Sequence, residues 1–306
     1  MTATATTRLA VLLTCATVAT TRFGLVLHEV VGHGGTALAL GGRIYAIKLF
    51  YFAGGWVGYA LDDAPPAAHL AANLGGIAIE LIAAAALWLA LRRRASLGAR
   101  FVRAIAAGLA VHATWYLAAG TWYGFGDGLA LYRVLGDARY PVAIAAALAG
   151  AAAGFAAARE AFAAIVRAAP GKRWIIAVAV ALAANGAAIG GELYVRHDAA
   201  YRAMMMSERD RTIGRELGHF RSGRPEASAD ELDAERRRLE GEHPAPFPFA
   251  PVFGAITLAA IVLGCRASLR RPGEPQAVSG RLAARAAIIA AAGMALVVAI
   301  QLVFGS

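Results

Sequence analysis

Seven long apolar stretches constrain this chain more than any other feature of its sequence. They cover approximately residues 8–27, 67–91, 104–120, 141–165, 174–193, 249–265 and 284–304. A membrane-spanning helix needs about 20 mostly apolar residues, and this chain is 59% hydrophobic but only 16% charged. We therefore expect an all-α fold, a polytopic transmembrane helix bundle of about seven spans embedded in the lipid bilayer.

The net charge of +10 would suit a nucleic-acid-binding protein, but the positive residues gather in three short connections between the apolar stretches. They are Arg92, Arg93, Arg94, Arg100 and Arg103, then Arg167, Lys172 and Arg173, then Arg266, Arg270, Arg271, Arg281 and Arg285. The positive-inside rule places such connections in the cytoplasm. We expect a multi-pass protein of the cell membrane with a cytoplasmic N-terminus, an extracytoplasmic C-terminus and no nucleic-acid partner.

Three regions follow from this pattern. Residues 1–193 form a membrane-embedded core, 194–248 an extracytoplasmic loop, and 249–306 two C-terminal transmembrane helices. Within the core, residues 43–61 contain two runs rich in aromatic and β-branched residues around a glycine pair, which predicts a small membrane-associated β-hairpin. The loop has ten arginines against eleven acidic residues over 196–246, and we expect it to be helical and solvated.

The first apolar region carries a cluster of ionisable residues, His28-Glu29-Val30-Val31-Gly32-His33. Such residues are costly and rare in a membrane span, so three within six positions predict a functional site. Two imidazoles can bind zinc, and an adjacent carboxylate can take a proton from a zinc-bound water. We therefore predict zinc as the cofactor, His28 and His33 as ligands, and Glu29 as general base.

The spacing of the two histidines requires a distorted helix. In the H-E-x-x-H motif they are four residues apart and share a face, but here they are five apart and diverge by about 140° on a regular helix. A π-bulge would return them to one face, with Gly32 lowering its steric cost. An alternative geometry uses Glu29 and His33 as ligands without His28, and a hydrogen-bonded patch without metal is another interpretation.

Two families share features with this region. The six-residue motif resembles the H-E-x-x-G-H zinc motif of dipeptidyl-peptidase III, and the longer run Leu27–Ile44 resembles the corresponding segment of site-2 proteases, which are intramembrane zinc proteases. The second resemblance implies that Asp127, in the pair Asp127-Gly128, is the third ligand. It also implies that Asn73 donates a hydrogen bond during catalysis, and that the hairpin holds an unwound substrate as an added strand.

Two further residues compete for the metal. Glu80 lies in the middle of the second stretch, where a lone carboxylate is a ligand, a proton-handling group or a partner for a neighbouring helix. His112 lies within the third stretch and is more often a hydrogen-bonded packing residue. Both remain alternatives to Asp127.

The expected function is an intramembrane zinc metallopeptidase, an enzyme that hydrolyses peptide bonds in a membrane-spanning or membrane-proximal protein or peptide. One alternative is a non-catalytic multi-pass membrane protein, a transporter or assembly factor, that holds a structural metal ion. Another is a metal-dependent hydrolase of membrane lipids.

Overall fold

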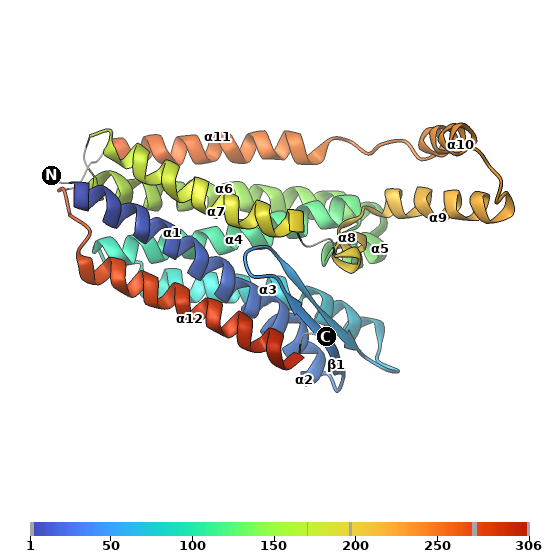
Figure 1. The fold of residues 1–306 in the computed structure, drawn as a ribbon, viewed down its shortest axis with the longest axis horizontal. Coiled ribbons are helices and arrows are strands. Elements are labelled where there is room, and N and C mark those ends of the chain that lie inside the picture. Colours follow the sequence, from blue (N-terminus) through green and yellow to red (C-terminus); the bar gives the residue numbers. More distant parts are fainter. Residues whose placement is uncertain (1–2, 170, 196–197, 271–273, 305–306) are drawn as a thin grey trace.

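The computed structural model describes residues 3–169, 171–195, 198–270 and 274–304 and is a helical bundle (Figure 1). Within these residues, seven helical segments are long and apolar enough to cross a membrane: Thr4–Ala39, Pro66–Leu91, Leu97–Tyr123, Gly128–Ala168, Arg173–Val195, Phe249–Leu269 and Gly280–Phe304. Each contains most of one of the seven apolar stretches. The predicted all-α transmembrane bundle is confirmed.

The first and fourth spans are each built from three elements. The first comprises α1 (Ala3–Leu25), η1 (Val26–Gly34) and α2 (Gly35–Ala39), and the fourth comprises α5 (Gly128–Leu135), η2 (Gly136–Ala138) and α6 (Arg139–Ala168). The other spans are α3 (Pro66–Leu91), α4 (Leu97–Tyr123), α7 (Arg173–Val195), α11 (Phe249–Leu269) and α12 (Gly280–Phe304).

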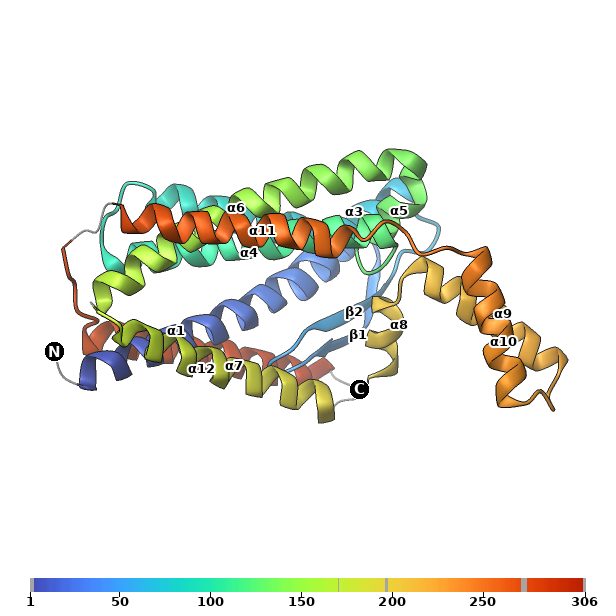
Figure 2. The same ribbon diagram turned by 90° about the horizontal axis from the view of Figure 1, so that it is seen from above.

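The spans form two layers, one of α1, α7 and α12 and the other of α3, α4, α6 and α11 (Figure 2). Small residues let the helices of the second layer approach closely. Gly150 of α6 faces Thr114 of α4, and Gly264 of α11 lies against the backbone of Phe155. Close contact through small side chains is how helices associate where lipid removes the hydrophobic driving force.

One end of the bundle collects the three arginine-rich connections. An apolar core there joins the start of α1 to the start of α4, the end of α6 and the start of α12, through Leu9, Leu97, Ala164 and Ala283. The N-terminus lies at this same end (Figure 1). The hairpin, α5 and the helices within residues 199–242 lie at the opposite end (Figure 1).

The predicted hairpin is present as β1 (Arg43–Leu49) and β2 (Gly55–Ala60), paired antiparallel from Arg43↔Ala60 to Leu49↔Gly55. Its turn is held from two sides. Arg22 of α1 donates hydrogen bonds of 2.5–2.9 Å to three carbonyls of residues 50–53, and Glu192 of α7 accepts bonds of 2.5–2.9 Å from three amides of the same segment.

The loop between the fifth and sixth spans contains α8 (Ala199–Met205), α9 (Glu208–Gly223) and α10 (Ala229–Glu242). The expected helical character is confirmed. Ser228 begins α10 with a capping box in which its side chain and that of Glu231 bond each other's backbone amides. Helices α9 and α10 project away from the bundle (Figure 2), whereas α8 lies beside the hairpin.

Candidate metal centre

The first span widens by a π-helical segment at the motif predicted to bind metal. Segment η1 continues α1 into α2 without a break, with the i→i+5 hydrogen bonding of a π-helix. On this wider turn His28 and His33 share a face, with ring centroids 4.9 Å apart and Nε2 atoms 3.2 Å apart. The distortion required by the five-residue spacing is therefore present.

Three glycines allow α3 to lie directly against η1. A Cβ added at Gly32 would lie 2.5 Å from the Cα of Gly76, and a Cβ added at Gly75 would overlap the carbonyl oxygen of Gly32. A Cβ added at Gly76 would lie 2.6 Å from Nε2 of His33 and 2.7 Å from Nε2 of His28. Gly32 thus serves helix contact as well as the widened turn.

Asp127 reaches the two histidines from the turn between α4 and α5. Gly124 and Gly126 precede it with φ of +73° and +50°, left-handed conformations that glycine adopts without steric cost. Oδ2 of Asp127 lies 2.9 Å from Nε2 of His28 and 3.2 Å from Nε2 of His33. The structure therefore brings together these three predicted ligands, each at most 9% exposed.

In each imidazole, the partner of Nδ1 bears on whether Nε2 is free to bind a cation. Nδ1 of His33 lies 2.8 Å from the carbonyl oxygen of Ala72; a carbonyl only accepts, so Nδ1 carries a proton, and in the neutral ring Nε2 has the lone pair. Nδ1 of His28 lies 3.3 Å from the carboxylate of Glu80, an ion-pair distance without hydrogen-bond geometry. Metal-binding histidines characteristically direct their second nitrogen to such an acceptor.

With both rings neutral, three acceptor atoms face one another in a buried space. No hydrogen bond of ordinary geometry reaches Oδ2 of Asp127 from any described residue. A proton on either imidazole would give this carboxylate a donor, and a metal ion would satisfy all three atoms at once. The three separations of 2.9–3.2 Å are close to the roughly 3.3 Å between ligand atoms around tetrahedral zinc with bonds of about 2.0–2.1 Å. The residues present therefore fit a zinc ion.

Glu80 lies on the other side of His28, away from Asp127. Its Oε2 is 3.3 Å from Nδ1 of His28 and 3.0 Å from Nδ1 of His112. These three side chains form a second group that could hold a metal, but its His112 is exposed. Glu80 faces Nδ1 of His28, whereas Asp127 faces Nε2 of the same ring. Glu80 is therefore not one of the three side chains that meet at the Nε2 atoms, and its position suits it to orient the His28 ring.

Glu29 is 8% exposed and lines a cavity of about 470 Å³ together with His28, Glu80 and His112. Its carboxylate accepts a backbone hydrogen bond from Val57 of β2. The proposed base is thus beside the triangle and faces a space large enough for part of a substrate.

Asn73 is not brought into this cavity. Its amide nitrogen donates to the carbonyl oxygen of His69 at 2.8 Å, and its amide oxygen accepts from the hydroxyl of Tyr59 at 3.1 Å. Burial raises the pKa of Tyr59 to about 12, so the hydroxyl remains a donor at neutral pH. Both polar groups of the Asn73 side chain therefore have partners other than His28 and His33.

Sequence reasoning missed Tyr116, which lines the cavity and packs edge-on against His28 with ring centroids 6.0 Å apart. The sequence offered one indication of this, because Tyr116 follows His112 by four residues and therefore shares its face of the α4 helix. Tyr201 and Met205 of α8 also line the cavity, and no local pattern connects them with the motif.

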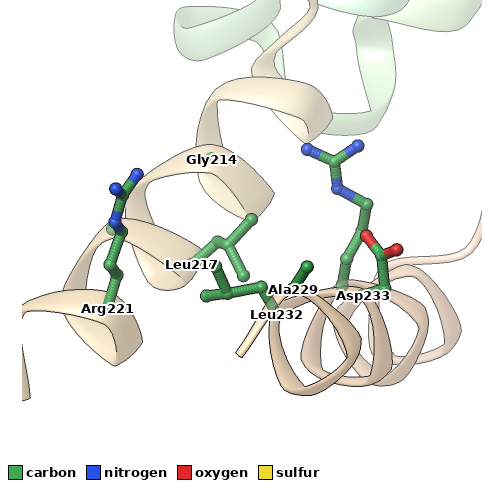
Figure 3. A pocket seen from close by; sticks show the side chains of 8 residues that line it. Gly214, Leu217, Arg221, Ala229, Leu232 and Asp233 are labelled. Carbon is green, nitrogen blue, oxygen red and sulfur yellow. The ribbon is translucent and has the colours of Figure 1, made fainter. Parts of the chain in front are cut away.

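A second cavity, of about 440 Å³, lies between α9 and α10 (Figure 3). Its walls carry the apolar side chains of Leu217 and Leu232 and the charged side chains of Arg221 and Asp233. It contains no histidine or cysteine, and it lies on the projecting helices, outside the candidate metal centre.

Comparison of the chain with models of known protein families, with curated proteins and with solved structures finds no match.

Proposed function

We propose that this protein is an intramembrane zinc metallopeptidase that hydrolyses peptide bonds in membrane-spanning or membrane-proximal substrates. The observation that carries the proposal is the triangle of Nε2 of His28, Nε2 of His33 and Oδ2 of Asp127, at separations of 2.9–3.2 Å. Three protein ligands leave one position of a tetrahedral ion open, as catalytic zinc sites do.

In this proposal, zinc supplies Lewis acidity that polarises the substrate carbonyl and lowers the pKa of a water molecule. The oxygen of that water adds to the carbonyl carbon while Glu29 takes a proton from the water. The electron pair of the C=O bond moves to the carbonyl oxygen. When the C–N bond breaks, the pair returns to re-form the carbonyl, and Glu29 passes the proton to the leaving nitrogen.

A strand beside the site favours a peptide over a lipid as substrate. Val57 of β2 contacts Glu29 directly, and each strand of the two-stranded sheet has one edge without a strand partner in the described part of the chain. An extended peptide pairs with such an edge through its backbone, whereas an acyl chain has no groups to do so.

The proposal includes an orientation. The gathering of the arginine-rich connections at the N-terminal end of the bundle supports a cytoplasmic location for that end. The hairpin, Asp127 and helices α8 to α10 would then lie toward the extracytoplasmic side, where the substrate is cut.

The decisive experiment is metal analysis of the purified protein in detergent. Wild type is expected to hold about one zinc ion per chain, and His33→Ala should hold none. The matched control is His69→Ala, which removes an exposed histidine and should hold the wild-type amount. Glu29→Gln should keep the zinc and lose hydrolysis of an internally quenched peptide library, because the base is not a ligand.

Two results would overturn the proposal. A wild-type protein that takes up no stoichiometric zinc after dialysis against zinc-buffered solution has no catalytic metal. Hydrolysis of peptides by Glu29→Gln at the wild-type rate would show that Glu29 is not the general base. Zinc binding without peptide hydrolysis in wild type would instead favour the non-catalytic metal-binding protein.

A further inference from the structure

A peptidase of the proposed kind needs a hydrogen-bond donor for the carbonyl oxygen that becomes negative during the reaction. Asn73 is the residue that the resemblance to site-2 proteases suggests, but its NH₂ group donates to the carbonyl oxygen of His69 at 2.8 Å. It also lies outside the cavity that Glu29 and His28 line. The donor must therefore come from another element.

Tyr116 of α4 borders the same cavity as His28 and Glu29. Its ring lines the same cavity, lies edge-on to His28, and stacks on His112 with an angle of 9° between the ring planes. A Cβ built on Gly126 would overlap its hydroxyl oxygen, and the backbone amide of Asp127 faces that oxygen. The hydroxyl is thus held against the turn that carries the proposed third ligand.

The hydroxyl proton of Tyr116 is not committed to a strong acceptor. It points to the sulfur of Met205 on α8, at 3.8 Å, and a thioether is a weak acceptor. The oxygen meanwhile receives the amide of Asp127, which orients the O–H bond away from the turn. A carbonyl oxygen entering the cavity would be a better acceptor than Met205 and would displace it.

We propose that Tyr116 is a catalytic residue that donates a hydrogen bond to the substrate carbonyl oxygen as negative charge develops on it. This inference rests on the proposed peptidase function. As water adds to the carbonyl carbon and its proton passes to Glu29, the C=O electron pair moves to the oxygen beside the Tyr116 hydroxyl. The hydroxyl keeps its proton throughout, and the pair returns to carbon when the C–N bond breaks.

The first test is Tyr116→Phe, which removes only the hydroxyl. Loss of one such donor lowers kcat by roughly 10²–10³-fold, and we expect a change of this size with KM and zinc content near the wild-type values. The matched control is Tyr194→Phe, an exposed tyrosine of α7 outside the cavity lining, which should leave kcat unchanged. Asn73→Ala, the competing candidate, should change kcat less than about threefold.

The second test needs no turnover. Cobalt-substituted protein is titrated with two inhibitors, and the cobalt absorption bands report binding. A phosphinic alanine tripeptide presents a tetrahedral anion. Mercaptoacetyl-alanyl-alanine instead binds metal through sulfur. Tyr116→Phe should weaken the phosphinic peptide about 10–100-fold, as expected for a transition-state contact, and leave the thiol peptide unchanged.

Equal weakening of both inhibitors, or an unchanged kcat for Tyr116→Phe, would refute the role of Tyr116. A kcat loss in Asn73→Ala as large as that in Tyr116→Phe would return the role to Asn73. Absence of bound metal in wild type would refute the proposed function itself, which is a different and separately visible outcome.

Discussion

Among the buried ionisable side chains of the described residues, two groups lie at opposite ends of α4. Near its start, Glu160 of α6 accepts hydrogen bonds from Arg103 at 2.6 and 3.2 Å and from Arg100 at 3.2 Å. Arg103 also donates to the carbonyl oxygens of Leu91 and Arg94 at 2.8 and 2.7 Å. Every acceptor in this arginine cluster faces a donor.

Beyond the other end of α4 lies the candidate metal centre. Nε2 of His28, Nε2 of His33 and Oδ2 of Asp127 face one another there, and with both rings neutral all three are acceptors. Burial alone therefore does not mark a functional site in this protein. The two groups differ in which atoms meet: carboxylate and carbonyl oxygens face guanidinium donors in the arginine cluster, where Arg103 links the end of α3 and Glu160 of α6 to α4, whereas the histidine group has a geometry that a cation would satisfy.

The largest expected effect tests the structural side of this comparison. Arg103→Ala leaves Glu160 buried with one cationic partner fewer, which should lower the free energy of unfolding by about 3–5 kcal/mol. Thermal unfolding in detergent measures this, and the zinc content of the folded fraction should not change. Arg93→Ala, at an exposed position in the same connection, is the control. A loss no greater than that of the control would mean that the cluster is not structural.

A methyl group can be placed directly at the metal centre by Gly76→Ala. Its Cβ would lie 2.6–2.7 Å from both Nε2 atoms, so the histidines must move apart. Overpacking of this kind costs about 1–3 kcal/mol, and zinc affinity should fall more than tenfold. Gly108→Ala is the matched control, since outside its own stretch of helix no described atom lies within 4 Å of its added Cβ. Wild-type zinc binding by Gly76→Ala would contradict the ligand triangle.

The Glu80→Gln variant distinguishes an orienting residue from a ligand. Loss of the carboxylate that faces Nδ1 of His28 should weaken zinc binding about 10–100-fold, with the ion still bound at saturation. Competition with a chromophoric chelator measures the affinity. Loss of zinc as complete as in His33→Ala would instead make Glu80 a ligand and move the metal to the group that contains His112.

The smallest effect concerns the contact between α8 and the hairpin. Asp198 accepts a hydrogen bond from the Lys48 ammonium at 2.6 Å, and this contact lowers the pKa of Asp198. The contact therefore stabilises the folded state fully above the ordinary carboxyl pKa of about 3.9. It is lost as pH falls through the lowered value.

We expect this contact to contribute about 0.2–1 kcal/mol. Amide hydrogen exchange in α8, corrected for intrinsic rates, should be faster in Asp198→Asn than in wild type at pH 7, and the two proteins should converge at low pH. Asp62→Asn, which removes the exposed pair with Arg43, should leave α8 unchanged. Equal exchange in wild type and Asp198→Asn at pH 7 would show that the contact does not restrain α8.

Local sequence was sufficient for the fold class and for the core of the site. Runs of about 20 apolar residues can satisfy their backbone in lipid only as helices, so the seven spans follow from composition. The spacing of His28 and His33, together with the requirement that both imidazoles bind one ion, was sufficient to predict the π-helical turn. The hairpin likewise followed from two short β-branched runs around a glycine pair.

Only the tertiary structure decided which carboxylate meets the histidines, and in what role. Glu80 approaches His28 from α3, and Asp127 approaches it from the turn after α4. They lie on opposite sides of one imidazole because of how α3 and α4 pack against η1. For the same reason Tyr116, for which the sequence made no prediction, lines the cavity, and Asn73 does not. Such choices depend on close approach at Gly32, Gly75 and Gly76, a contact between distant segments that no local pattern encodes.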